Sequence, residues 1–150
     1  MHFDEIWRHH GARASMGFDR GLLCLRYVGP LTVPHWRQAM RLADDLIDAP
    51  VLAVLADVSR AVVLSDHRDS GHAPQGSVMR SNVPGAMVVP ATHLEQYRDF
   101  AWRLAQVGIE RAVFTDAALA LAWARGLIDD PETLPEFLLA GAARERARPA

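Results

Sequence analysis

The sequence predicts an α/β domain with a mostly parallel five-stranded sheet, opened by a β-hairpin and covered by helices on its faces. The first observation behind this prediction is the run 51–56, which is apolar at every position. Such a run is typical of a strand in a parallel sheet, because helices cover both faces of that sheet. The second observation is the order of the elements. Strand-like runs alternate with helical periods, as in right-handed β-α-β units.

A β-hairpin is predicted near the N-terminus. The segments 12–18 and 22–28 flank a tight turn, Asp19-Arg20-Gly21, and the second segment is rich in leucine, tyrosine and valine. Two such runs joined by a short glycine-containing turn are typical of a hairpin. Gly29-Pro30 then ends the second strand.

The first helix is predicted to begin after Thr32 and to stop at Pro50. Thr32 can cap the helix, and Pro34 falls in the first turn, where the missing N–H costs little. Apolar side chains recur at helical spacing and predict an amphipathic helix. These side chains are Trp36, Met40, Ala43 and Ile47.

Three short apolar runs, 51–56, 85–89 and 111–114, are predicted to be the central strands of the sheet, mutually parallel. The polar segment 65–82 between the first two is the least regular part of the chain, and its length suggests a functional loop.

Further helices are predicted after the second and third of these strands. Thr92 with Glu95 forms a potential capping box, and Asp116 can cap a helix that runs through Leu127. A C-terminal helix is expected over about 131–145, followed by a frayed tail. We therefore expect one domain over 1–150, with its core over about 12–127.

The composition limits the possible functions. The chain has 150 residues, half of them hydrophobic, and a formal net charge of −2, which favours neither a nucleic-acid partner nor an anionic membrane. All 16 basic residues are arginine, which suggests a GC-rich bacterial gene. The lone Cys24 fits a reducing compartment. No apolar stretch has the length of a signal peptide or a membrane span, so we expect a cytoplasmic protein.

Three segments resemble the STAS-like family, relatives of the bacterial anti-sigma-factor antagonists that include a SEC14/STAS-like branch. Residues 25–32 (LRYVGPLT) look like the opening strand and capped helix, and 54–59 (VLADVS) look like the central strand with its Asp-x-Ser ending. Residues 113–116 (VFTD) and 120–123 (ALAW) look like the closing strand and its helix. The resemblance covers about 12–127. It implies a non-enzymatic regulatory or binding module that meets a protein partner or a small ligand.

The family pattern also includes a phosphorylatable serine before a glycine, shortly after the central strand. Asp69-Ser70-Gly71 is similar, although it lies several residues later and has one hydroxyl residue fewer. The resemblance therefore makes Ser70 the first candidate for phosphorylation and Ser59, in the Asp-x-Ser ending, the second.

The candidate binding residues are those predicted at the carboxyl ends of parallel strands, where ligands of open α/β sheets gather. They are Asp57, Ser59, His93, Thr115 and Asp116. Asp57 requires a polar partner because it directly follows a fully apolar run. An alternative interpretation is that Asp116 and Thr92 serve only as helix caps.

An alternative function is a small hydrolase or transferase that uses Ser59, His93 and Asp116 in the same crevice. No Gly-x-Ser-x-Gly nucleophile elbow and no glycine-rich phosphate loop accompany these residues. We therefore assign no catalytic residue and expect no cofactor.

Two further interpretations concern the polar loop and the second long helix. Asp66, His67, Asp69 and His72 are metal-ligand types, but their spacing matches no established zinc pattern, so we predict no metal site. Phe100 and Trp102 broaden the apolar arc of the helix after Thr92, which raises the possibility of a homodimer.

Overall fold

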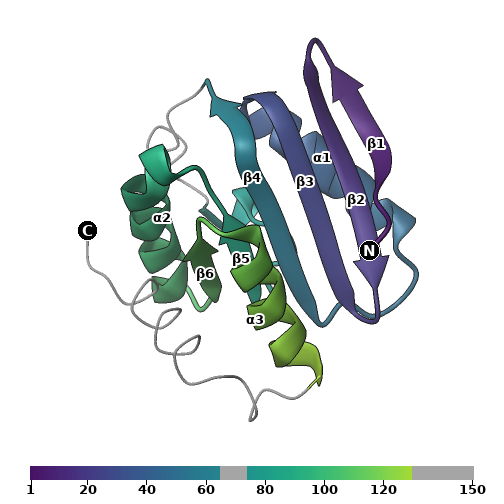
Figure 1. Cartoon of the computed structure of the whole chain (residues 1–150), viewed down its shortest axis with the longest axis vertical. Helices are drawn as coiled ribbons and strands as arrows, with labels where there is room; N and C mark the ends of the chain where they lie inside the picture. Colours follow the sequence, from purple (N-terminus) through teal and green to yellow (C-terminus); the bar gives the residue numbers. More distant parts are fainter. Residues whose placement is uncertain (65–73, 130–150) are drawn as a thin grey trace.

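A six-stranded mixed sheet forms the centre of the molecule (Figure 1). The computed structural model describes residues 1–64 and 74–129. The strands lie side by side in chain order. They are β1 (Asp4–His9), β2 (Ala12–Asp19), β3 (Leu22–Leu31), β4 (Ala53–Val63), β5 (Gly85–Val88) and β6 (Arg111–Phe114). The first two pairs are antiparallel and the last three pairs are parallel.

Helices cover both faces of this sheet. Helices α1 (Val33–Leu46) and α2 (Leu94–Gln106) pack on one face, whereas α3 (Ala117–Asp129) packs on the other, over β4, β5 and β6. Right-handed crossovers between strands in sequential order place the connecting helices on the same side, which explains the shared face of α1 and α2. The short 3₁₀ helix η2 (Pro74–Ser77) contacts both of these helices.

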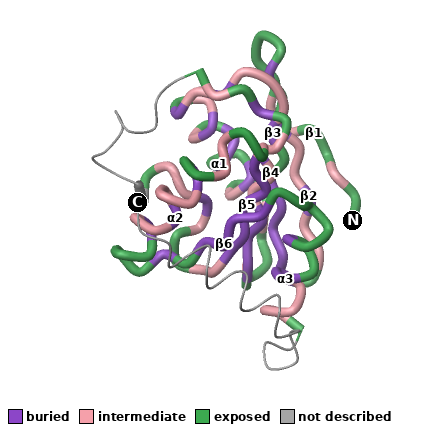
Figure 2. Tube along the Cα trace, turned by 60° about the vertical axis from the view of Figure 1, so that its left-hand side comes forward, coloured by how far each residue is buried: buried purple, intermediate pink, exposed green. Residues whose placement is uncertain are grey.

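The core has two layers, one on each side of the sheet. Figure 2 shows the buried residues concentrated in the strands at the centre of the molecule. Alternate residues of β4 show the division, because Val54 packs under α1 and α2 whereas Leu55 packs under α3. Side chains of a strand alternate between the faces, so a strand that is covered on both sides must be apolar throughout. This confirms the burial predicted for residues 53–55 of the run, whereas the strand begins only at Ala53 and Leu52 before it is exposed.

The strand count and the parallel character of the predicted sheet need correction. The sheet has six strands rather than five and is mixed, because β1 adds a second antiparallel pair at the edge. This strand is polar and largely exposed, so it lacks the apolar run that marks the interior strands. The strand at 111–114 is parallel as predicted, but it lies at the other edge rather than in the centre.

The predicted start of α1 is confirmed, whereas three other predictions are wrong. Gly29-Pro30 does not end the second strand of the hairpin, because β3 continues through both residues to Leu31. Thr32 caps α1, since its Oγ1 accepts a hydrogen bond from the amide of His35 at 3.3 Å. Strand β4 does not end near residue 56 but continues to Val63. The predicted capping box is absent, because Thr92 lies within the 3₁₀ helix η3 (Ala91–His93) and α2 begins without a side-chain cap. The predicted C-terminal helix and tail lie outside the described residues.

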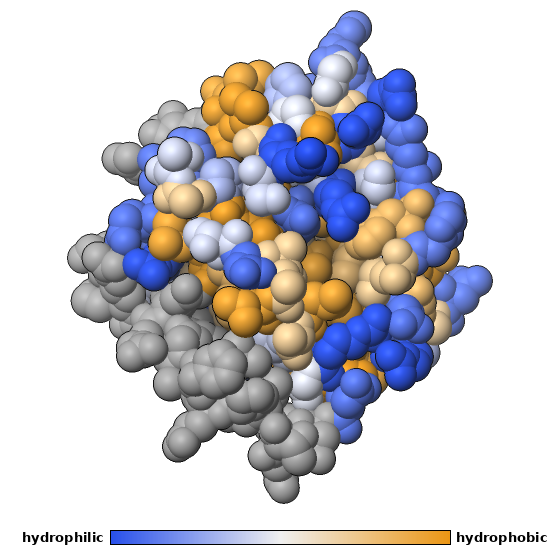
Figure 3. Space-filling view, in the orientation of Figure 1, coloured by the Kyte–Doolittle hydropathy of each residue, from blue (hydrophilic) through white to orange (hydrophobic). Residues whose placement is uncertain are grey.

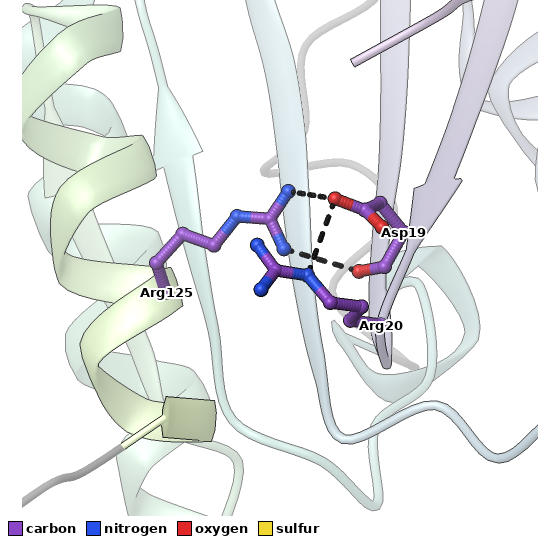
Figure 4. Close-up of polar contacts among 3 residues, drawn as sticks. All are labelled: Asp19, Arg20 and Arg125. Carbon is purple, nitrogen blue, oxygen red and sulfur yellow. Dashed lines mark hydrogen bonds and ion pairs between the residues drawn. The ribbon is translucent and has the colours of Figure 1, made fainter.

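A buried arginine and an ion pair hold the layers together. Arg111 donates from its guanidinium to the backbone carbonyls of Met79, Arg80, Val83 and Glu110, which ties the turn before β5 to β6. Figure 4 shows the second tie, between α3 and the β2–β3 turn. There the side chain of Arg125 donates to the Asp19 carboxylate at 2.8 Å and to its carbonyl at 3.1 Å.

No helix in the described part of the chain is long and apolar enough to cross a membrane.

Candidate functional site

Asp57 lies level with the ends of two neighbouring strands. It pairs with Val88, the last residue of β5, and Val88 pairs with Phe114, the last residue of β6. Strand β4 itself runs six residues further, to Val63. The prediction that Asp57 and Ser59 leave the sheet at the end of their own strand is therefore wrong. They still lie beside the carboxyl ends of β5 and β6.

The Asp57 carboxylate is held by neighbours on both oxygens. Its Oδ1 accepts hydrogen bonds from the Ser59 amide at 3.0 Å and from the Ser59 hydroxyl at 2.6 Å. Its Oδ2 lies 3.7 Å from Nε of Arg26 on β3. The Asp57 side chain is only 15% exposed. An acid in this position needs such partners, because a partly buried carboxylate without them is costly.

A β-bulge makes the Ser59 contact possible. The pairing of β3 with β4 shifts register between the Arg26 and Val28 positions, so β4 carries an additional residue there. Bulges re-aim side chains and are frequent next to binding sites. Here the bulge places the Ser59 amide and hydroxyl on the same carboxylate oxygen.

Thr115 and Asp116 follow β6 and are both exposed. The Asp116 Oδ1 accepts from the amides of Ala118 at 2.8 Å and Leu119 at 3.2 Å, at the start of α3. The carboxylate therefore caps the helix, as one of the two sequence interpretations held. Its outer face remains exposed beside Thr115.

His93 lies at the start of α2 and is half-buried. The connection after β5 leads to α2 on one face of the sheet, and the connection after β6 leads to α3 on the opposite face. Open α/β sheets bind ligands where neighbouring connections diverge in this way. His93 thus lies at the start of the helix on one face of the sheet, and Asp116 lies at the start of the helix on the opposite face.

The three residues of the hydrolase alternative do not form a catalytic constellation. The Ser59 hydroxyl donates to Asp57, and the Asp116 carboxylate accepts from helix amides. A nucleophile needs a base within hydrogen-bond reach. Within residues 1–64 and 74–129, no hydrogen bond joins Ser59, His93 and Asp116.

The other candidate chemistry divides between described and undescribed residues. Ser70 and the Asp66, His67, Asp69 and His72 loop lie outside the described residues. In the described part, no cluster of three or more histidine, cysteine or acidic side chains is arranged to hold a metal ion. Burial raises the pKa of the Cys24 thiol to about 11, so Cys24 is a neutral core side chain at physiological pH.

Sequence reasoning missed Arg26 and Phe3 as parts of this site. The Arg26 guanidinium carbon lies 4.1 Å from the centre of the Phe3 ring, a cation–π contact beside Asp57. The pairing of Arg26 with Asp57 follows from strand register, which the run of residues does not reveal. Strand alternation could have placed Arg26 on the same face as Cys24.

Comparison with known proteins shows a structural likeness to solved structures. No protein-family model matches the chain, and no curated protein matches it. The chain is similar in structure to an uncharacterised protein of the DUF3478 family from Shewanella loihica PV-4, which has a SpoIIAA-like, that is STAS-like, fold. The two share 20% sequence identity, with a TM-score of 0.49. The match covers 79% of this chain and 97% of that chain.

Proposed function

We propose that this chain is a non-enzymatic binding module of STAS-like type, which meets a protein partner at the carboxyl ends of β5 and β6. The binding residues are Asp57, Ser59, His93, Thr115 and Asp116. The observation that carries this proposal is the Asp57 carboxylate, held by Ser59 and Arg26 beside these strand ends. A carboxylate that is fixed before binding loses little conformational entropy when a partner docks.

The charge of this edge indicates what a partner would present. Asp57 and Asp116 supply two carboxylates, while the exposed Thr115 hydroxyl lies next to Asp116 in the chain. Amide, guanidinium and ammonium donors complement such a surface. The hydrogen bonds already made by Ser59 and Asp116 favour binding over hydrolysis or group transfer.

Phosphorylation of Ser59 would regulate the same edge. A phosphate at its hydroxyl removes the hydrogen bond to Asp57 and adds nearly two negative charges beside that carboxylate. The repulsion would free Asp57 and change the surface that the partner meets. Phosphopeptide mass spectrometry on the protein from its native host tests Ser59 and Ser70 together.

Site-specific photo-crosslinking in the native host tests the binding site. The crosslinking residue replaces Thr115 in one variant and Val107 in the control, which is also exposed but lies near the opposite end of β6. We expect a discrete protein adduct at position 115 and none at 107. Asp57→Asn should lower the adduct yield about tenfold, as loss of a charge-assisted hydrogen bond would.

Two results would overturn the proposal. Equal adducts at both positions would show that the strand ends are not the contact surface. An undiminished adduct with Asp57→Asn would remove the residue on which the proposal depends.

A further inference from the structure

One half of a sheet face is left without a helix. Helix α3 covers β4, β5 and β6. In the described part of the chain no helix packs on the same face of β1, and α3 reaches β2 only at its last residue, Asp19. Figure 1 shows this open half beside α3, with the upper parts of β3 and β4 also uncovered. Figure 3 shows strongly hydrophilic residues over those upper parts, with apolar ones between them.

A row of arginines crosses this open face. Arg8 on β1 pairs with Arg13 on β2, Arg13 pairs with Val28 on β3, and Val28 pairs with Arg60 on β4. The neighbours Ala12 and Ala14 are buried in the core under α1, so Arg13 must point to the opposite, open face. Residues paired across neighbouring strands share a face, which places Arg60 on the open face as well.

The adjacent row adds one more arginine and two acids. It consists of Glu5, Ser15, Arg26 and Asp57. Arg8 donates two hydrogen bonds to Glu5, at 2.8 and 3.1 Å.

The face has more arginines than acids to pair with them. Arg26 lies beside Asp57. In the described residues, Arg13 and Arg60 have no hydrogen bond or ion pair, and both are exposed. Strands lie about 4.8 Å apart, so these two cations flank Val28 at a separation of two strands.

Apolar side chains lie among the cations. Val62 is 59% exposed and pairs with Pro30, in the row beyond Val28. Arginine and exposed aliphatic groups together are typical of protein interfaces, whereas a nucleic-acid backbone offers phosphates but no aliphatic groups to cover Val62. Phe3 stacks on Arg26 and limits its motion, which lowers the entropy lost on binding.

We propose that this open face, defined by Arg13, Arg26, Arg60, Val28 and Val62, docks an acidic segment of a partner protein in which carboxylates alternate with aliphatic residues. Carboxylates of the segment would pair with Arg13 and Arg60, and its aliphatic side chains would cover Val28 and Val62. This surface goes beyond the proposed function, because Arg13 on β2 and Arg60 on β4 lie outside the row that contains the ends of β5 and β6. Only Arg26 belongs to both surfaces, through its pairing with Asp57.

A nuclear magnetic resonance titration tests this docking face with a defined probe. The probe is a short synthetic peptide in which glutamate alternates with valine, and its control replaces every glutamate with glutamine. We expect the acidic peptide to shift the amide resonances of Arg13, Val28 and Arg60, and the glutamine peptide to leave them in place. Added salt should weaken the binding.

Charge reversal supplies the matched protein variants. Arg13→Glu with Arg60→Glu should weaken binding at least tenfold, whereas Arg41→Glu, the same change at an exposed position of α1, should leave it within twofold. If the double variant unfolds, Arg13→Gln with Arg60→Gln replaces it. Asp57→Asn, which tests the strand-end site, should not weaken this binding.

The proposal fails if the acidic peptide shifts resonances around every exposed arginine alike or shifts none. It also fails if vesicles containing phosphatidylserine produce the same shifts as the peptide, since the face would then recognise a lipid surface. Equal shifts with inorganic phosphate would show that the face binds anions in general, and this result would also overturn the proposal.

Discussion

Leu55 illustrates how one side chain secures the layer under α3. It is 7% exposed and packs with Trp123 and Ala124 of that helix. We expect Leu55→Ala to lower the free energy of unfolding by about 2–5 kcal/mol, through lost burial and the remaining cavity. Urea denaturation monitored by circular dichroism measures this loss.

Leu52 provides a matched control three residues earlier. The residue is 53% exposed, so the same substitution removes much less buried surface than at Leu55. We expect Leu52→Ala to change the free energy of unfolding by less than about 1 kcal/mol. Similar losses for both variants would show that Leu55 is not a core residue.

Arg111 is an unusual core residue, because its buried cationic side chain donates hydrogen bonds to backbone carbonyls. Its guanidinium donates to the carbonyls of Val83 at 2.7 Å and Arg80 at 3.0 Å, and desolvation lowers its pKa to about 10. We expect Arg111→Met to cost about 2 kcal/mol or more in a urea melt, because buried carbonyls would lose their donor.

The control for this substitution is Arg41→Met on the exposed surface of α1. It should change stability by less than about 0.5 kcal/mol. If Arg111→Met is equally harmless, the turn before β5 does not depend on the guanidinium.

At the scale of elements, three histidines join the β1–β2 turn to α1. The ring of His9 lies 4.2 Å from that of His10 and 4.6 Å from that of His35, between centroids. Desolvation, followed by the repulsion of His10 and His35, lowers the pKa of His9 below its ordinary value of 6.5. The unfolded ring therefore takes up a proton at higher pH than the folded ring.

This difference predicts a loss of stability at acidic pH. The contribution of His9 is fully present above about pH 6.5 and is lost as the pH falls below that value. We expect the melting temperature to fall between pH 7.5 and pH 5, and His9→Gln to reduce that fall. His93→Gln is the control at a distant position. An identical pH profile for His9→Gln and wild type would contradict the prediction.

At the scale of the whole molecule, the two edges of the sheet differ in protection. Strand β1 is an exposed edge, whereas all four residues of the opposite edge, β6, are buried under α2 and α3. Local opening requires less free energy where few buried contacts must be broken. Hydrogen exchange should therefore be faster in β1 than in β6, and slowest in the interior strands β3 and β4.

Comparison of the two edges shows whether burial or position at the edge of the sheet determines the rate of hydrogen exchange. If β6 exchanged as fast as β1, an unpaired edge alone would determine protection. The rates could be measured on the same sample, residue by residue.

The predicted homodimer also belongs to this scale. Phe100 packs against the core under α2, so it is not part of an exposed apolar surface, while Trp102 is half-buried. The broad apolar arc of α2 is thus largely explained by packing within the chain. Light scattering of wild type and Trp102→Arg tests what remains of the homodimer hypothesis.

The local sequence determined the elements whose buried side chains form a regular apolar pattern along the chain. The helix after Thr32, the hairpin around Gly21 and the apolar run of β4 could all be predicted, because their side chains repeat at 3.6 or 2 residues or are apolar throughout. Of the candidate site, the sequence indicated that Asp57 needs a partner and that Asp116 caps α3.

Only the tertiary structure decided the strand order, the edge strand β1 and the continuation of β4 to Val63. It also decided the contacts that define both proposed surfaces. Arg26 meets Asp57 and Arg13 shares a row with Arg60 because of strand register. Register joins residues far apart in the chain through backbone hydrogen bonds that every residue type can make, so it leaves no local pattern to read.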